Sequence, residues 1–312
     1  MATDITAYLL FMAGSAVLCF ALFAFSAKRQ MKLSGRRAAA LGAVSFGLAV
    51  LLGVFCAKLL YFIFRAGYLL NMDFGGWLLS LKAGELSYYG AAAGVCLAVF
   101  LAAKILGEKP GKALNAFAAA GALLAALARF AEYWLGSLGA GDFIEEALPF
   151  PLAISEVWNP DYPEYYLAIF MLEGILSLRV AVFALHNRKD RLCFLRTVFY
   201  LCLLQVICES MRATSIRWLF VRYEQLLCFL IAEGILVWYA LAGRKKGVHN
   251  WGAAAFGLLV CALTVLEEFM LDGKVTPGGY ALPPVVIYGF MAWGLLELAV
   301  FEHTARKKLD IA

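Results

Sequence analysis

The chain has 312 residues, of which 63% are hydrophobic and only 16% are charged, and its formal net charge is +5. Soluble domains carry about 25% charged residues, so this composition excludes an ordinary soluble protein and indicates a polytopic membrane protein. The basic excess does not indicate nucleic-acid binding, because these residues lie in short turns between apolar stretches, where anionic lipid headgroups favour them.

Nine apolar stretches are long enough to cross a bilayer, which takes about 20 helical residues. They predict an all-α fold of about nine transmembrane helices. In chain order they cover residues 6–26, 38–64, 86–106, 113–135, 165–186, 194–210, 222–242, 251–270 and 284–302. We expect the first to be a retained span rather than a signal peptide, because residues 1–6 carry no positive charge and Leu18 is a poor cleavage site.

The basic residues orient these helices. Eighteen lysines and arginines lie in alternate connections, whereas the opposite connections hold six. Basic connections stay on the cytoplasmic side of the membrane, so the sequence predicts that the N-terminus lies outside and the C-terminus inside. The basic, inner segments are 27–37, 104–112, 186–196, 243–250 and 302–312.

The remaining composition indicates neither a metal nor a cofactor. The eight cysteines are scattered without C-x-x-C spacing, so a metal site or a disulfide framework is not predicted. The outer loop 136–164 has six acidic and no basic residues, and we expect a solvated loop rather than a partner-binding surface. His186, His249 and His303 lie on inner segments, so proton transfer at the outer end must use a carboxylate, a tyrosine or the substrate.

Polar side chains gather at the outer ends of five spans. Arg129 lies within an apolar segment, and Glu132 follows on the same helix face. An ionisable residue at that depth usually faces the bundle interior and marks a pathway or a bound anion. The others are Lys58, Tyr61, Tyr88, Tyr89, Glu209, Arg212, Arg217, Arg222 and Gln225.

For Arg217 and Arg222 we favour unrelated snorkelling, in which each side chain reaches the membrane interface on its own. Glu173 and Glu233 also lie within spans, and helix-packing hydrogen bonds explain them equally well.

Five segments, in this order, resemble motifs of the bacterial prolipoprotein diacylglyceryl transferases. They are CAKLLYFIF (56–64), KAGELSYYGAAAG (82–94), LARFAEYWLG (127–136), NPDYPEYYLAIFMLEG (159–174), and CESMRATSIRW (208–218) followed by RYEQLL (222–227). The similarity covers residues 12–242. It implies a transferase-like membrane core over residues 1–242, to which residues 243–312 add two helices that the seven-span family does not have.

The family transfers a diacylglyceryl group from phosphatidylglycerol, in the outer leaflet of the bacterial cytoplasmic membrane, to the lipobox cysteine of a preprolipoprotein. The resemblance implies catalytic roles for Arg129, Glu209, Tyr89 and Glu132. It implies substrate-binding roles for Arg212, Gln205, Gln225, Tyr88, Tyr61 and Lys58. Three positions depart from the family pattern: Tyr89 stands at a histidine, Glu132 at an asparagine and Gln205 at an arginine.

Three functions remain open. The first is a phospholipid-dependent transferase in lipoprotein biosynthesis, with phosphatidylglycerol as donor and a preprolipoprotein or another acceptor. The second is a non-catalytic lipid- or partner-binding membrane protein that has kept the fold, as the replaced positions and the added helices suggest. The third is a small-solute transporter, which the sequence disfavours because it shows neither paired broken helices nor an internal repeat.

Overall fold

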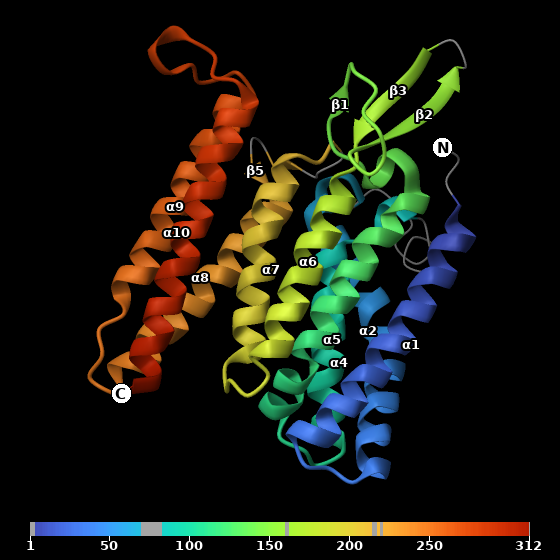
Figure 1. The fold of residues 1–312 in the computed structure, drawn as a ribbon, viewed down its shortest axis with the longest axis vertical. Coiled ribbons are helices and arrows are strands. Elements are labelled where there is room, and N and C mark those ends of the chain that lie inside the picture. Colours follow the sequence, from blue (N-terminus) through green and yellow to red (C-terminus); the bar gives the residue numbers. More distant parts are fainter. Residues whose placement is uncertain (1–3, 70–82, 160–161, 214–216, 219–220, 312) are drawn as a thin grey trace. The chain divides into compact units, whose positions relative to one another are not determined.

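The computed structural model describes residues 4–69, 83–159, 162–213, 217–218 and 221–311. Within these ranges nine helices are long and apolar enough to cross a membrane, which confirms the predicted all-α, multi-pass membrane protein (Figure 1). Lys82, in the second of the quoted motifs, and Asp161, in the fourth, lie outside the described residues. The helices are α1 (Ile5–Gln30), α2 (Gly35–Leu69), α4 (Tyr88–Ile105), α5 (Pro110–Ala131), α6 (Ile169–His186), α7 (Cys193–Ser210), α8 (Tyr223–Arg244), α9 (Trp251–Leu271) and α10 (Pro284–Ile311).

Local chemistry fixes several helix ends. The Asp4 side chain accepts a hydrogen bond from the Ala7 amide at 2.9 Å and caps α1, and Ser87 caps α4 in the same way. These caps satisfy amide groups that the first turn of a helix leaves without a partner. Pro110 begins α5, where its missing N–H donor costs nothing. Polar caps and proline thus set the ends of otherwise uniformly apolar segments.

The helices belong to two compact units, each described by itself. Unit 1 comprises Met1–Thr197 and Arg212–Thr214, and unit 2 comprises Val198–Met211 and Ser215–Ala312. In unit 1, α5 packs against α1, α4 and α6, while α2 packs against α1 and α4; in unit 2, α8, α9 and α10 pack against one another. The domain division that we predicted after residue 242 stays a prediction.

Two glycines bring α2 and α4 into backbone contact. A Cβ atom at Gly90 would overlap the α2 backbone at Cys56 and Ala57, and one at Gly94 would overlap it at Leu52. Small residues at this spacing let membrane helices approach closely. The contact, with a 3.2 Å hydrogen bond from the Ser87 amide to the Ala57 carbonyl, holds the start of α4 against α2.

We expect Gly90→Val to lower the free energy of unfolding by about 1–3 kcal/mol, because the added side chain forces the two backbones apart. Unfolding in mixed detergent micelles measures this loss. Gly14→Val in α1 is the control, since a Cβ there meets no atom within 4 Å. Equal destabilisation by the two substitutions would contradict the close contact of α2 with α4.

The acidic loop 136–164 and the residues directly after it form a folded segment. It contains a three-stranded antiparallel sheet in the order β1 (Phe143–Ile144), β3 (Tyr162–Leu167) and β2 (Ala153–Asn159). Ala153 pairs with Leu167 and Ser155 with Tyr165. Residues 165–167, which we assigned to the fifth span, therefore end a strand, and α6 begins only at Ile169. The acidic residues Asp142, Glu145 and Glu146 are exposed, as predicted.

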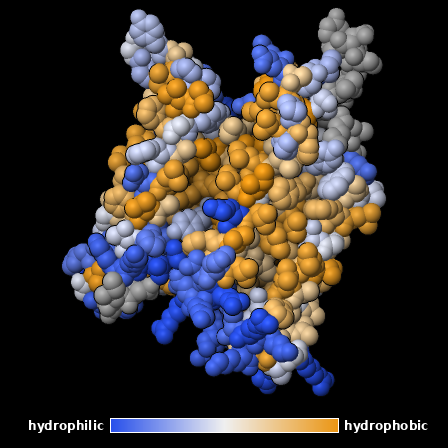
Figure 2. Space-filling view, viewed as in Figure 1, coloured by the Kyte–Doolittle hydropathy of each residue, from blue (hydrophilic) through white to orange (hydrophobic). Residues whose placement is uncertain are grey.

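Unit 1 has an apolar middle and one strongly hydrophilic end. Figure 2 shows apolar side chains across the middle of its helices and hydrophilic ones gathered below them. The hydrophilic end carries the connections α1–α2, α4–α5 and α6–α7, which Figure 1 places opposite the sheet. This is the end that the basic residues predict to be cytoplasmic.

Candidate functional site

Four charged side chains form one buried cluster in unit 1, which we call the charge quartet: Arg129, Glu132, Glu173 and Arg212. Arg129 Nε lies 2.8 Å from Glu173 Oε2, and Arg129 Nη1 donates to Glu132 Oε1. Arg212 Nη2 lies 2.9 Å from Glu132 Oε2 and also donates to Glu173 Oε2. Both carboxylates are therefore shared by both guanidinium groups, and the four formal charges cancel.

The quartet is assembled from three separate segments. Arg129 lies in the last turn of α5, and Glu132 begins the short 3-10 helix that follows. Glu173 lies one turn inside α6. Arg212 follows α7, and a β-bridge to Gly141 ties its backbone to the segment before β1. Each charge thus sits near the sheet end of a helix, and together they lie at one depth.

A glycine on α6 allows α5 and α6 to approach closely enough for these pairs. A Cβ atom at Gly174 would overlap the ring of Phe130, which follows Arg129 on α5. Since Gly174 also follows Glu173, one contact sets the distance between the two helices beside the ion pair. The close approach is therefore a condition for the Arg129–Glu173 contact.

Tyrosines from α4 border the quartet. The Arg129 guanidinium carbon lies 3.7 Å from the centroid of the Tyr88 ring, in cation–π geometry. Tyr89 packs edge-on against Tyr88, with ring centroids 5.4 Å apart, and is itself buried. Tyr88 therefore joins the predicted site directly, and Tyr89 lies next to it.

Lys58 and Tyr61 lie on α2, three residues apart. The Lys58 side chain is buried, and its Nζ atom lies 3.3 Å from Glu85 Oε2. Tyr61 is half-buried. Glu85, which lies within the motif segment 82–94, thus forms an ion pair with a predicted site residue.

One acceptor atom of the quartet has no donor among the described residues. Glu173 Oε1 is buried and has no hydrogen-bond partner among the residues that the structure describes. Buried polar atoms are normally paired with protein, water or a ligand. Glu132 is the most exposed member of the quartet, at 9%, against 2% for Arg129 and 0% for Glu173. The quartet thus combines a carboxylate oxygen without a described donor, two guanidinium groups held by ion pairs, and one member, Glu132, that is slightly more exposed than the others.

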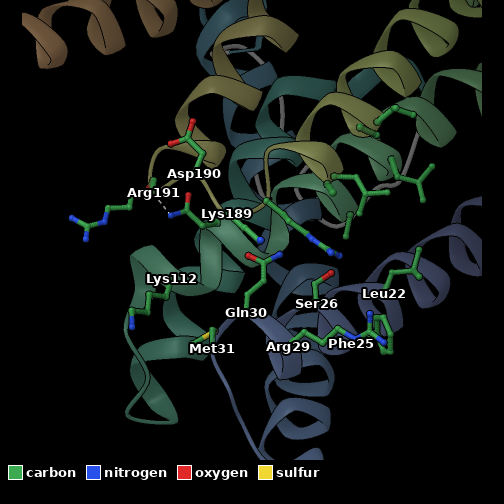
Figure 3. A pocket seen from close by; sticks show the side chains of 18 of the residues that line it. Leu22, Phe25, Ser26, Arg29, Gln30, Met31, Lys112, Lys189, Asp190 and Arg191 are labelled. Atoms are coloured by element: carbon green, nitrogen blue, oxygen red, sulfur yellow. Dashed lines mark hydrogen bonds between the residues drawn. The ribbon is translucent and has the colours of Figure 1, made fainter. Parts of the chain in front are cut away.

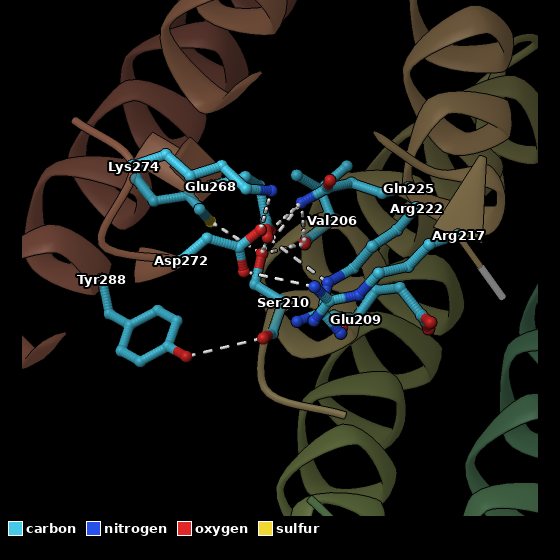
Figure 4. Close-up of polar contacts among 11 residues, drawn as sticks. Val206, Glu209, Ser210, Arg217, Arg222, Gln225, Glu268, Asp272, Lys274 and Tyr288 are labelled. Carbon is cyan, nitrogen blue, oxygen red and sulfur yellow. Dashed lines mark hydrogen bonds and ion pairs between the residues drawn. The ribbon is translucent and has the colours of Figure 1, made fainter. Parts of the chain in front are cut away.

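Unit 2 holds a second buried polar group, which we call the Glu268 cluster (Figure 4). The Glu268 carboxylate accepts hydrogen bonds from Ser210 Oγ, from Gln225 Nε2 at 3.0 Å and from Arg222 Nε at 3.3 Å. Arg222 Nη1 also donates to the Glu209 carbonyl at 2.7 Å. The cluster joins the end of α7, the start of α8 and the end of α9, so Gln225 links helices within this unit.

The predicted site residues are divided between the two units. Arg129, Glu132 and Arg212 meet in unit 1, whereas Gln205, Glu209 and Gln225 belong to unit 2, where all three are buried. Within unit 2, Glu268 binds Gln225 and Arg222, and Arg222 donates to the Glu209 carbonyl, so the Glu268 cluster joins Gln225 to Glu209. The gathering of both sets into one site stays a prediction.

The two arginines that we expected to snorkel behave differently. Arg222 does not reach the interface: it is buried, because Glu268 and the Glu209 carbonyl bind it inside unit 2. Arg217 is exposed, as predicted, and its Nη1 lies 3.2 Å from Asp272 Oδ1. Partial burial opposes ionisation of Asp272, but the Lys274 hydrogen bond and the charge of Arg217 outweigh it and hold the pKa of that carboxyl below its ordinary value.

Fold and site together define a multi-pass helical membrane protein with a buried, charge-neutral ionic site at the sheet end of its first unit. Comparisons with protein-family models, curated proteins and solved structures found no match. The resemblance to the diacylglyceryl transferases therefore rests on the sequence motifs alone, and the activity that it implies enters below as a proposal.

Proposed function

We propose that this protein is a phospholipid-dependent transferase acting at the outer leaflet of a bacterial cytoplasmic membrane. It moves a diacylglyceryl group from phosphatidylglycerol to a lipoprotein cysteine or a related acceptor. The observation that carries the proposal is the charge quartet. In it, ion pairs hold two buried arginines beside a carboxylate oxygen that has no hydrogen-bond partner among the described residues.

Arg129 and Arg212 suit the phosphate of the donor. A guanidinium group stays charged at any pH and forms paired hydrogen bonds to phosphate oxygens. In the transfer, the acceptor sulfur forms a bond to the glycerol carbon, and the bond from that carbon to the phosphate oxygen breaks. The electron pair leaves with glycerol phosphate, and donors fixed in advance stabilise the charge that develops there.

The carboxylates suit the remaining groups. Glu173 Oε1, which has no hydrogen-bond partner among the described residues, is placed to accept a bond from a hydroxyl of the glycerol headgroup. Glu132, at the more exposed edge, takes the proton that the acceptor thiol loses. Tyr89, at the position of the family histidine, supplies a hydrogen-bond donor.

A second function is favoured by a specific observation. Both arginines are already engaged by Glu132 and Glu173, so the quartet is neutral before any ligand binds. A phosphate must therefore displace a carboxylate from a guanidinium group. An arrangement that resists this displacement fits a non-catalytic lipid- or partner-binding protein that keeps the quartet as a structural ionic centre.

Turnover of labelled phosphatidylglycerol with a lipobox peptide, in nanodiscs, tests the proposal. We expect wild-type turnover, and a loss of about 100-fold in Arg129→Lys, because lysine keeps the charge but loses the paired hydrogen bonds to the leaving group. Arg179→Lys is the matched control, since Arg179 is exposed on α6.

Thermal unfolding of each variant shows whether it is folded. Wild-type protein that binds phosphatidylglycerol without turnover would reject the transferase and support the second function. Equal turnover in the Arg129→Lys and Arg179→Lys variants would show that Arg129 has no role in the reaction.

A further inference from the structure

A groove opens at the basic end of unit 1, between α1 and α6 and over the surface of α5 (Figure 3). Its volume is about 770 Å³, within the range of small-molecule sites. Small side chains of α5, Ala119 and Ala120, form part of its floor. Because α1 and α6 both pack against α5, the groove follows the direction of the helices.

The mouth of the groove is strongly basic. Five lysines and arginines line it, from the end of α1, the start of α5 and the α6–α7 turn: Arg29, Lys112, Arg188, Lys189 and Arg191. Among the described residues that line the groove, Asp190 is the one carboxylate. Its Oδ2 atom lies 3.1 Å from Nη1 of Arg196, which is not a lining residue, so the positive charge of the mouth is not offset.

Polar and apolar groups are ordered along the groove. Figure 3 shows Ser26 and Gln30 pointing from α1 toward the α6–α7 turn, while the Asp190 carboxylate points away from them. Deeper along the helices the walls are apolar and partly exposed, as at Leu22 with 40% and Val182 with 43% exposure. The groove therefore has cations and hydrogen-bonding groups at its mouth and an aliphatic wall beyond them.

We propose that this groove binds an anionic phospholipid of the leaflet at the basic end of the helices. The phosphate lies among the five cations, headgroup hydroxyls meet Ser26 and Gln30, and an acyl chain lies along Leu22 and Val182. Basic pockets between membrane helices bind anionic headgroups in this way. A zwitterionic lipid should bind more weakly because it lacks the net negative charge that the basic mouth attracts. Free phosphate should also bind more weakly, because it has no acyl chain to contact the apolar wall.

The inference is independent of the proposed function. The groove is lined by the first half of α5 and the last half of α6, whereas Arg129 and Glu173 lie toward the other ends of these helices. A lipid in the groove is therefore a second bound lipid. Either site can be removed by substitution without altering residues of the other.

Native mass spectrometry of the purified full chain, with phosphatidylglycerol or phosphatidylcholine of equal acyl length, counts the bound lipids. We expect Lys112→Gln/Lys189→Gln to weaken binding of one phosphatidylglycerol about 25-fold, since each basic residue near an anionic lipid contributes about fivefold. Lys245→Gln/Lys307→Gln is the control: it removes the same charge from exposed residues that do not line the groove.

Two further variants complete the test. Val182→Trp, which obstructs the apolar wall without changing charge, should weaken the lipid but not inorganic phosphate. The Arg129→Lys variant should keep the lipid of the groove, which separates this proposal from the proposed function. Equal loss in the control pair, equal binding of phosphatidylcholine, or inorganic phosphate binding as tightly as phosphatidylglycerol would each overturn the proposal.

Discussion

Replacing Arg129 with methionine is expected to lower the free energy of unfolding by about 3–5 kcal/mol. The substitution leaves Glu132 and Glu173 to share the single guanidinium group of Arg212, and a buried charge that loses its partner is costly. Unfolding in mixed detergent micelles at neutral pH measures the loss.

A charge-balanced variant separates electrostatics from lost contacts. Arg129→Met/Glu132→Gln removes one charge of each sign and leaves the Arg212–Glu173 pair intact, so we expect it to recover more than half of the loss. Arg179→Met, at an exposed position of α6, should change the free energy by less than about 0.5 kcal/mol. If Arg129→Met lowers the free energy of unfolding no more than Arg179→Met does, the quartet does not stabilise unit 1.

In unit 2, Glu268→Leu is expected to cost about 3–5 kcal/mol. It removes the carboxylate that binds the buried Arg222, and it deprives Ser210 and Gln225 of a common acceptor. The same unfolding experiment measures this effect.

The neighbouring residue gives a matched control. Glu267 Oε2 is buried without a hydrogen-bond partner among the described residues, so Glu267→Leu removes an unfavourable group and should be neutral or stabilising. The two substitutions change the same residue type, on the same helix, by the same volume. Similar losses in both would show that the Glu268 cluster does not hold unit 2 together.

The helices could be predicted because each is an apolar run bounded by charged or turn-forming residues. The exceptions have physical causes. Residues 165–167, two tyrosines and a leucine, continue the apolar run of α6, and only their pairing with β2 shows that they form a strand. The last helix was predicted to stop at Glu302, yet it continues to Ile311. Glu302 is buried in unit 2 and accepts hydrogen bonds from Tyr200 at 2.9 Å and Tyr239 at 3.0 Å, so this charge does not mark a helix end.

Specific pairs of charged residues could be predicted from the sequence only where both lie on one helix. Arg129 and Glu132 lie three residues apart, and helix geometry alone places them together. Glu173 was explained equally well by helix packing, because sequence periodicity gives the face on which a residue lies but not the helix opposite it. The available signal was an acidic residue in an otherwise apolar span, at the same depth as a buried arginine. Tyr88 was predicted to lie at the same depth, and the structure places its ring against the Arg129 guanidinium group.

The composition of the quartet bears on how the protein is made. Arg129 and Glu132 neutralise each other within one segment, so this end of α5 enters the membrane without a net charge. Glu173 enters the membrane with α6, and Arg212 emerges from the ribosome 39 residues later, after the whole of α7. Until then, the only guanidinium group of the quartet that Glu173 can meet is already shared with Glu132. The order of synthesis therefore delivers the parts of this site one at a time, and its charge balance is complete only when α7, the sixth of the long helices described, has been inserted.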